Sequence, residues 1–294
     1  MLDKLEYLIV LAAERHFGRA AERLGITQPT LSAGIRQLEE RLGATLVNRG
    51  SRFQGMTEEG ERVLAWARRI SDDVRTMREE VHNVRRGLSG HLRIGAIPTA
   101  LAIVAKLTTP FRARHENVTF EVTSHTSAEI VSGVENFELD VGLTYLDDER
   151  LRRLDAYSLY AERYCLVTTR GSRFSDYETV TWEEVATLPL CLLSGTMQNR
   201  QILNRHLGAN GRRFTAVMES NSMIALLSQT RAANLATIMP FRSAAVLGLA
   251  EPMVAIPITA PDVSYRIGLV TARRDMRPPI VAAFWEEARL QTEL

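Results

Sequence analysis

The side chains of Gln28 and Arg36 are of types that read the edges of DNA bases. A glutamine amide can make two hydrogen bonds to an adenine, and an arginine can bond a guanine or a phosphate. Pro29, Thr30 and Ser32 stand between them and suit contacts to the DNA backbone or to a thymine methyl group. Two plainer interpretations stay open. Gln28 could be a solvated residue of a first helical turn, and Arg36 a surface arginine paired with a nearby glutamate.

These side chains need an element that holds them on one exposed face. Residues 16–42 predict two short helices joined by a tight turn, with Gly25 ending the first helix in a left-handed conformation. Thr27 can cap the second helix, and Pro29 is tolerated in its first turn. The opposite face of the second helix has apolar residues at helical spacing, which predicts a buried stripe of Leu31, Ile35, Leu38 and Leu42. A polar half-helix delivered by a tight turn is what a DNA-reading helix-turn-helix requires.

The segment NRGSRFQGMT at residues 48–57 predicts a two-stranded wing, because glycine and arginine stand between short apolar pieces. Arg49 and Arg52 would lie there, as phosphate or minor-groove contacts. The alternative is that both are ordinary loop charges.

An apolar residue recurs after the wing in alternating steps of four and three. This pattern predicts one long helix with a coiled-coil seam between two copies of the chain. A long helix packed on its own domain is the alternative. Gly87 and the pair Ser89–Gly90 end the pattern. The seam residues are Val63, Ala67, Ile70, Val74, Met77, Val81, Val84 and Leu88.

The composition is that of an ordinary globular protein, with 294 residues, 45% hydrophobic and 24% charged. The net charge of +1 does not by itself suggest nucleic acid, but DNA binding needs only a local basic surface. No apolar run reaches membrane-spanning length and no signal segment is recognisable, so we expect a cytoplasmic protein without a membrane partner. The two cysteines, Cys165 and Cys191, lack metal-type spacing and are expected to be reduced core thiols.

From His91 the pattern changes to alternating strands and helices, which predicts an α/β region with mostly parallel sheets. The expected strands are 91–96, 118–124, 139–143, 164–169, 189–193, 214–218, 236–240 and 265–271. The expected helices are 99–114, 127–136, 199–208, 221–232 and 278–291.

The order and length of these regions resemble the LysR-type transcriptional regulators. The resemblance is carried by FGRAAERLGITQPTLSAGIRQLEERLGATL, the wing with Arg49, TEEG at 57–60, GHLRIG and ELDVGL. It implies an all-α winged helix-turn-helix over 1–58, a dimerising linker helix over 59–89 and an effector domain over 90–294. That domain would resemble periplasmic binding proteins, with two Rossmann-like lobes, 91–161 plus 268–294 and 162–267. A small inducer would bind between the lobes, and members are commonly dimers of dimers.

The chain departs from the family pattern at four positions of the helix-turn-helix. His16 and Gly18 stand where serine and threonine are frequent. Ala33 and Gly34 follow Ser32 where a basic or long polar residue is usual, which removes a contact and lowers the local helix propensity.

Polar residues that follow strands of the effector domain are its candidate ligand contacts, because α/β sheets bind ligands at the ends of their strands. Helix N-termini there favour an anion, so we expect a small carboxylate or other anion as co-inducer. Helix capping alone is the plainer explanation for any one of them. The expected effector-binding residues are Pro98, Thr99, Ala100, His125, Thr126, Ser127, Thr144, Thr196, Gln198, Asn199 and Asn221.

The sequence therefore predicts an inducer-responsive regulator that binds double-stranded promoter DNA as a homodimer and as a homotetramer, with RNA polymerase as a candidate further partner. Catalytic motifs such as GxSxG, HExxH and the P-loop do not occur, so we expect no enzyme, no metal and no cofactor beyond the co-inducer. The rivals are a solute-binding or sensor protein without a DNA-binding role, and an enzyme with an N-terminal interaction domain. The expected DNA contacts are Thr27, Gln28, Pro29, Thr30, Ser32, Arg36, Arg49 and Arg52.

Overall fold

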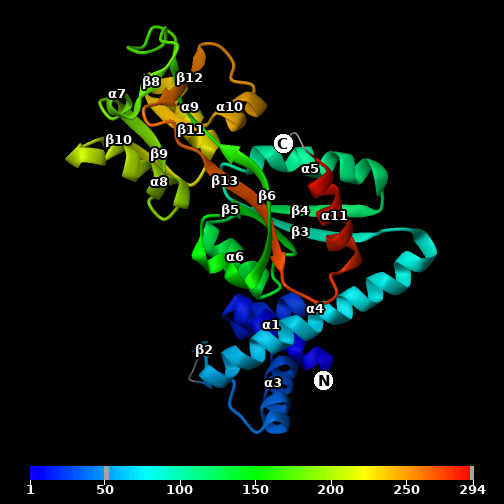
Figure 1. Ribbon diagram of the computed structural model, residues 1–294. Helices are drawn as coiled ribbons and strands as arrows, with labels where there is room; N and C mark the ends of the chain where they lie inside the picture. The colour runs from blue at the N-terminus through cyan, green and yellow to red at the C-terminus, as the bar shows by residue number, and fades with distance from the viewer. Residues whose placement is uncertain (50–52, 292–294) are drawn as a thin grey trace. The chain divides into compact units, whose positions relative to one another are not determined.

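The computed structural model describes residues 1–49 and 53–291, which fold as two compact units (Figure 1). Residues 1–87 form the first unit, and nearly all of residues 88–294 form the second. The first unit is helical apart from one short hairpin. Its elements are α1 (Leu2–Glu14), α2 (Phe17–Leu24), α3 (Gln28–Leu42), β1 (Val47–Arg49), β2 (Phe53–Met56) and α4 (Glu58–Arg86).

The predicted helix-turn-helix forms from the expected signals. Gly25 ends α2 with a φ of 66°, and the Thr27 hydroxyl accepts a hydrogen bond from the backbone N–H of Thr30 at the start of α3. The stripe of α3 is buried through Leu38. Leu42 was expected to be buried and is 41% exposed, because it lies in the last turn of α3, beyond the helices that cover the rest of the stripe.

Two of the unusual residues have structural explanations. The Nδ1 atom of His16 accepts hydrogen bonds from the backbone N–H groups of Gly18 and Arg19, so histidine caps α2 in place of serine or threonine. Gly34 is buried where α3 crosses α1: a Cβ atom there would lie 2.6 Å from the Tyr7 ring. Only glycine lets the two helices approach this closely.

The wing is an antiparallel pair of β1 and β2, as expected. Its position is fixed by Glu39 of α3, whose carboxylate accepts hydrogen bonds from the backbone N–H groups of Leu46 and Val47. The rings of Phe17 and Phe53 also pack edge to face, with centroids 6.3 Å apart. The wing is therefore anchored to both helices of the helix-turn-helix.

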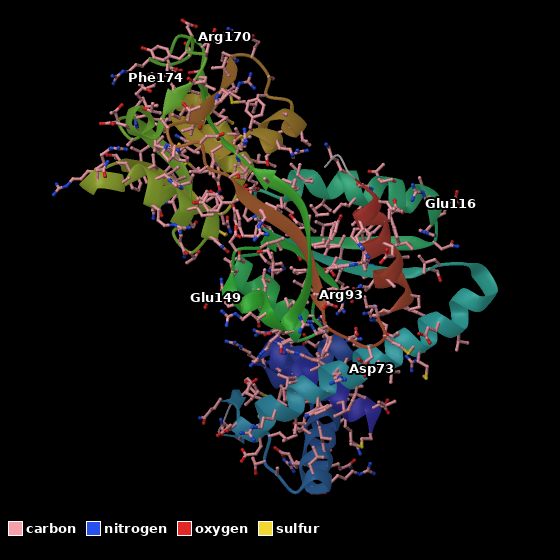
Figure 2. All side chains as sticks on the ribbon, in the orientation of Figure 1. Asp73, Arg93, Glu116, Glu149, Arg170 and Phe174 are labelled. Carbon is pink, nitrogen blue, oxygen red and sulfur yellow. The ribbon has the colours of Figure 1, made fainter. Side chains whose placement is uncertain are left out.

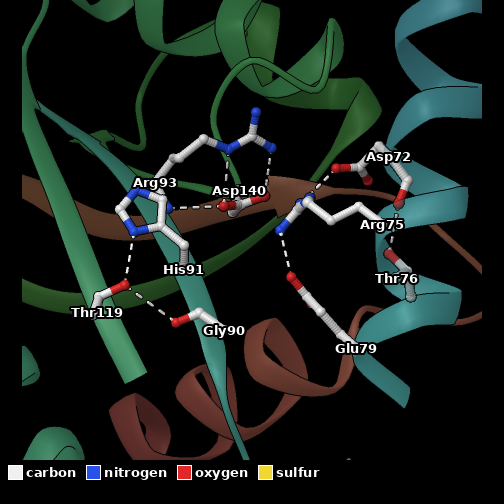
Figure 3. Close-up of polar contacts among 9 residues, drawn as sticks. All are labelled: Asp72, Arg75, Thr76, Glu79, Gly90, His91, Arg93, Thr119 and Asp140. Atoms are coloured by element: carbon white, nitrogen blue, oxygen red, sulfur yellow. Dashed lines mark hydrogen bonds and ion pairs between the residues drawn. The ribbon is translucent and has the colours of Figure 1, made fainter. Parts of the chain in front are cut away.

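The long helix α4 uses the predicted seam in two ways. Its first part packs in the core of its own unit through Val63, Leu64, Ala67 and Ile70. Farther along, Met77 and Val81 stay 56% and 61% exposed. The expectation that the whole seam lies between two copies is therefore wrong for the first half. Another face of α4 is polar, with Arg75 paired to Asp72 and Glu79 (Figure 3).

The second unit contains two lobes. The sheet of lobe one has the order β4 (Val118–Ser124), β3 (Gly90–Ala96), β5 (Val141–Tyr145), β13 (Tyr265–Ala272) and β6 (Leu154–Glu162). Its helices are α5 (Leu101–Arg114), α6 (Ser127–Glu135), the short η1 (Glu149–Arg153) and α11 (Pro279–Leu290). The sheet is braced by Arg93 of β3, whose guanidinium bonds both carboxylate oxygens of Asp140 just before β5 (Figure 3).

The sheet of lobe two has the order β10 (Thr215–Ser220), β9 (Pro189–Leu193), β11 (Ala236–Pro240), β7 (Tyr164–Thr169), β12 (Met253–Thr259) and β8 (Val180–Thr181). Its helices are α7 (Trp182–Val185), α8 (Gln198–Leu207), α9 (Met223–Ala233), α10 (Phe241–Leu247) and the short η2 (Ala209–Gly211). Glu116 of lobe one and Arg170 of lobe two lie toward opposite ends of this unit (Figure 2).

The α/β architecture with two lobes is as expected, but the sheets are mixed rather than mostly parallel. In lobe one, β3 pairs in parallel with β4 and β5, whereas β13 runs antiparallel to β5 and β6. The chain passes from lobe one to lobe two after Glu162 and returns before Tyr265. The return was expected at 268, which lies inside β13.

Candidate functional site

The outer surface of α3 carries the residues expected to touch DNA. Gln28, Pro29 and Thr30 are exposed, and so is Arg36 farther along the helix, while Ser32 is half-buried. Thr27 is exposed too, but its hydroxyl is engaged in the cap and with the Thr30 hydroxyl at 2.8 Å. The apolar stripe of α3 packs in the core, so the polar face on the opposite side of the helix is exposed to solvent.

Arg36 has no ion pair or hydrogen bond with any described residue, although Glu39 and Glu40 stand close in sequence. Glu39 is instead committed to the wing backbone. The guanidinium of Arg36 therefore remains available for an external anion. Arg49 ends β1, but its side chain and the whole of Arg52 lie outside the described residues.

A cavity of about 920 Å³ lies between the two lobes of the second unit. It is bordered by residues at the ends of β4, β9 and β10, by the first turns of α5, α6 and α9, and by Met197 just before α8. Five of the expected ligand residues line it: Pro98, His125, Thr126, Thr196 and Asn221.

The other six expected residues do not reach the cavity wall. Thr99, Ala100, Ser127, Thr144 and Asn199 are buried, and Gln198 is half-buried in the first turn of α8. Asn199 turns toward Tyr145, and the Thr99 carbonyl accepts a hydrogen bond from Ser243 of α10. The rule that ligand residues follow strands identified the loops that border the cavity. It could not predict which side chains of the first helical turn point into the cavity and which are buried.

Two carboxylates of the wall were missed from the sequence. Glu129 of α6 accepts hydrogen bonds from the Thr126 backbone N–H and hydroxyl at 2.8 and 2.9 Å, which lower its pKa and keep it charged. Glu219 of β10 pairs with the buried Arg200 at 2.7 Å. The spacing Thr126–Glu129 is a capping-box pattern, so the sequence held a signal for the first of them.

A buried acid lies where the chain passes between the lobes. Glu162 is fully buried and accepts a hydrogen bond from Tyr145 at 2.8 Å. Tyr145 in turn accepts one from Asn199 of lobe two at 3.2 Å. Burial raises the pKa of Glu162 to about 7, because the loss of hydration outweighs the stabilising hydrogen bond from Tyr145. This chain of contacts links α8 of lobe two to β5 and β6 of lobe one.

The two cysteines are free and buried, as expected. Burial raises the pKa of the Cys165 thiol to about 12, which keeps it in the protonated and less reactive form. Among the described residues, no group of three or more His, Cys, Asp and Glu side chains is arranged to hold a metal ion. The helices of the described ranges include none that is both long and apolar enough to span a membrane.

Comparison with known proteins finds similarity in both units. The family model described as "Bacterial regulatory helix-turn-helix protein, lysR family" matches residues 2–61, and the "LysR substrate binding domain" model matches residues 85–292. The uncharacterised HTH-type transcriptional regulator YfeR of Shigella flexneri is 24% identical over 293 residues, covering 99% of this chain and 94% of that protein.

Solved structures share the fold along the whole chain. A full-length OxyR variant from Pseudomonas aeruginosa, with one cysteine replaced by aspartate, has a TM-score of 0.77 at 22% identity, covering 99% of this chain and 95% of that one. Full-length CbnR complexed with its target DNA has a TM-score of 0.69 at 23% identity, covering 98% and 99%.

Proposed function

Since this chain belongs to the LysR family of DNA-binding transcriptional regulators, whose members carry an effector-binding domain, we propose that α3 is its recognition helix and that Gln28 and Arg36 read base edges. The observation that carries this assignment is the exposed polar surface at the start of α3, with the buried stripe on the opposite face of the helix. Thr27, Pro29, Thr30 and Ser32 position the helix on the DNA backbone, with Arg49 and Arg52 of the wing. The CbnR structure, which contains DNA, supports this mode of binding.

We further propose that the chain works as a homodimer through α4 and as a homotetramer of two such dimers. The support is the exposed apolar pair Met77 and Val81, which continues a seam that the first unit buries only in part. A regulator of promoter DNA acts in the cytoplasm of a bacterial cell, with RNA polymerase as a further partner. Its task is binding, and we assign it no catalytic role.

The cavity between the lobes is the proposed effector site. A volume of about 920 Å³ lies in the range of sites for small ligands. A small molecule there changes DNA binding only if it binds one arrangement of the lobes more tightly than the other. The expected anionic group of this co-inducer would lie at the first turns of the surrounding helices.

The test is binding of the full chain to DNA from upstream of its own gene, by gel shift over a series of salt concentrations. Gln28→Ala should lose about 1–3 kcal/mol on the operator but little on random DNA, because a base contact carries sequence discrimination. Gln37→Ala is the matched control, since Gln37 is also exposed on α3 but lies on another side of the helix. Equal losses for Gln28→Ala on both DNAs would refute the assigned role.

A further inference from the structure

The two lobes present the cavity with the same arrangement of elements. In lobe one the parallel strands β3 and β4 end together, and the His125 backbone N–H donates to the Ala96 carbonyl at 3.0 Å. In lobe two the parallel strands β9 and β10 end together, and the Ser194 N–H donates to the Ser220 carbonyl at 2.9 Å. Each lobe therefore sets two helix N-termini side by side at the cavity.

In each lobe, one of these two helices lacks a side-chain cap. No side chain caps α5 or α8, whose N-cap residues are Ala100 and Met197. Leu101 and Ala102 of the first turn of α5, and Met197 before α8, line the cavity. Free N–H groups and the positive end of a helix dipole favour a carboxylate.

The neighbouring helix or strand in each lobe brings a negative charge. Glu129 caps α6 with its Oε2 atom, and its Oε1 atom has no hydrogen-bond partner among the described residues. Glu219, next to the last residue of β10, also lines the cavity in the other lobe, but its charge is compensated by Arg200 at 2.7 Å. The wall contains these two carboxylates and His125, and no lysine or arginine is among its described residues. Glu129 is therefore the wall carboxylate without an ion-pair partner among the described residues, and it favours a cationic group of the ligand beside it.

Side chains behind this wall also lack partners. The Ser127 hydroxyl, in the first residue of α6, is 2% exposed and without a hydrogen-bond partner among the described residues. An unpaired buried hydroxyl is energetically unfavourable, and Ser127 directly follows the wall residue Thr126 in the chain.

The rest of the cavity surface is apolar and adaptable. Three methionines of lobe two line it, Met197, Met223 and Met239, together with Ile224 and Leu247. Methionine side chains are flexible and polarisable, so they fit aliphatic, thioether or aromatic groups.

We propose that the effector is a zwitterion of the α-amino acid class with an apolar side chain. Its carboxylate lies at the uncapped N-termini of α5 and α8, its ammonium group at Glu129, and its side chain against the methionines. This inference rests on the proposed effector site. It replaces a simple carboxylate by a ligand that carries both charges.

The experiment compares matched triads of compounds for binding to the full chain by titration calorimetry. The first triad is L-phenylalanine, 3-phenylpropionate and 2-phenylethylamine, and the second is L-leucine, 4-methylpentanoate and 3-methylbutylamine. At least one amino acid should bind about tenfold or more tightly than both of its partners, because each partner lacks one charge-assisted contact. Equal or tighter binding of an acid or an amine alone, or no binding in either triad, would overturn the proposal.

A variant separates the roles of the two charges. Glu129→Gln keeps an amide oxygen for the α6 cap but removes the charge. It should weaken amino-acid binding about tenfold and leave 3-phenylpropionate binding unchanged or stronger. Glu116→Gln, which lies outside the cavity wall, is the matched control. Unchanged amino-acid affinity in Glu129→Gln would refute the assignment of the ammonium group. A separate measurement tests the proposed effector site itself. That proposal would be refuted if no small molecule altered the footprint of the chain on DNA.

Discussion

At the scale of single residues, α3, the proposed recognition helix, contains a glycine whose effect on stability is the opposite of what helix propensity suggests. Replacing a helical glycine by alanine ordinarily stabilises a helix by about 1 kcal/mol. At Gly34 the added methyl group would lie 2.6 Å from the Tyr7 ring, so α3 and α1 would have to separate. We expect Gly34→Ala to lower the free energy of unfolding by about 1–3 kcal/mol.

Urea unfolding of the wild type and the variant checks this expectation, with Tyr7→Ala as the background for a second comparison. In that background the steric cause is gone, so Gly34→Ala should become neutral or stabilising. If Gly34→Ala lowered the free energy of unfolding equally in the wild-type and Tyr7→Ala backgrounds, the close approach to the Tyr7 ring would not be the cause of the loss.

The buried Glu162 carries a pH dependence of stability. Its pKa is raised to about 7 in the folded chain, from a usual value near 4.5, so the folded chain holds the proton more tightly than the unfolded chain. Its contribution is therefore fully present below about pH 4.5 and is lost as the pH rises through 7. A difference of this size corresponds to about 3 kcal/mol.

Glu162→Gln should remove this dependence, because the amide does not ionise. Relative to the wild type, the variant should gain stability between about pH 5 and pH 8, up to the order of 3 kcal/mol. Urea midpoints at the two pH values measure the gain, and Glu116→Gln controls for a general effect of removing a carboxylate. Parallel pH profiles of wild type and Glu162→Gln would exclude Glu162 as the source.

The sequence predicted single residues well where the signal is local. Thr27 and Gly25 were identifiable because caps and left-handed turns depend on neighbouring residues. The cavity was harder, because Asn199 and Thr196 follow the same strand and only the second lines it. Which of them does so depends on Tyr145, more than fifty positions away in the chain.

At the scale of elements, α4 is the long helix whose exposed apolar side chains call for a partner. Met77 and Val81 lie on the seam and remain mostly exposed in one chain. A charge in the seam should separate the copies, because it would be buried without a counter-charge. We expect Met77→Glu to reduce the molar mass in solution by at least half and to abolish cooperative operator binding.

Light scattering on the purified full chain measures this mass. Met276→Glu is the matched control, since Met276 is 73% exposed and lies in the second unit, outside α4. A Met77→Glu protein with the mass of the wild type would refute the assignment of α4 as the dimer interface.

Helices and strands were predictable from the sequence where their own hydrophobic pattern is strong. Strands buried on both faces, such as β7 and β9, read as short apolar runs. In contrast, most positions of β6 over LDAYSLYAE are exposed or half-buried, and β12 contains a proline, so neither was predicted as a strand. These are strands next to the two crossings between lobes, and both form antiparallel pairs, β6 with β13 and β12 with β7. The predicted strands also pair antiparallel, β13 with β5 and β11 with β7, which the strand patterns did not reveal.

At the scale of the whole molecule, the proposed dimer fixes the distance between its two copies of α3. Such a dimer reads two half-sites on one face of DNA, about one helical turn apart or a multiple of it. The salt dependence of binding then reflects the phosphate contacts of both DNA-binding domains together. The net charge of only +1 fits this arrangement, because each DNA-binding domain needs few phosphate contacts when two domains bind the same DNA.

The spacing of the operator half-sites tests this arrangement directly. Inserting about 5 base pairs turns the second half-site to the opposite face of the DNA, so only one α3 of the dimer can bind. Affinity should then fall steeply and the salt dependence should become shallower, because roughly half of the phosphate contacts are lost. Inserting about 10 base pairs returns the half-site to the same face and should restore part of the affinity. Gel shifts over a salt series on the three DNAs measure both quantities. Equal affinity at all three spacings would mean that each α3 binds DNA independently. Two rigidly coupled DNA-binding domains cannot both bind when one half-site is turned to the opposite face of the DNA.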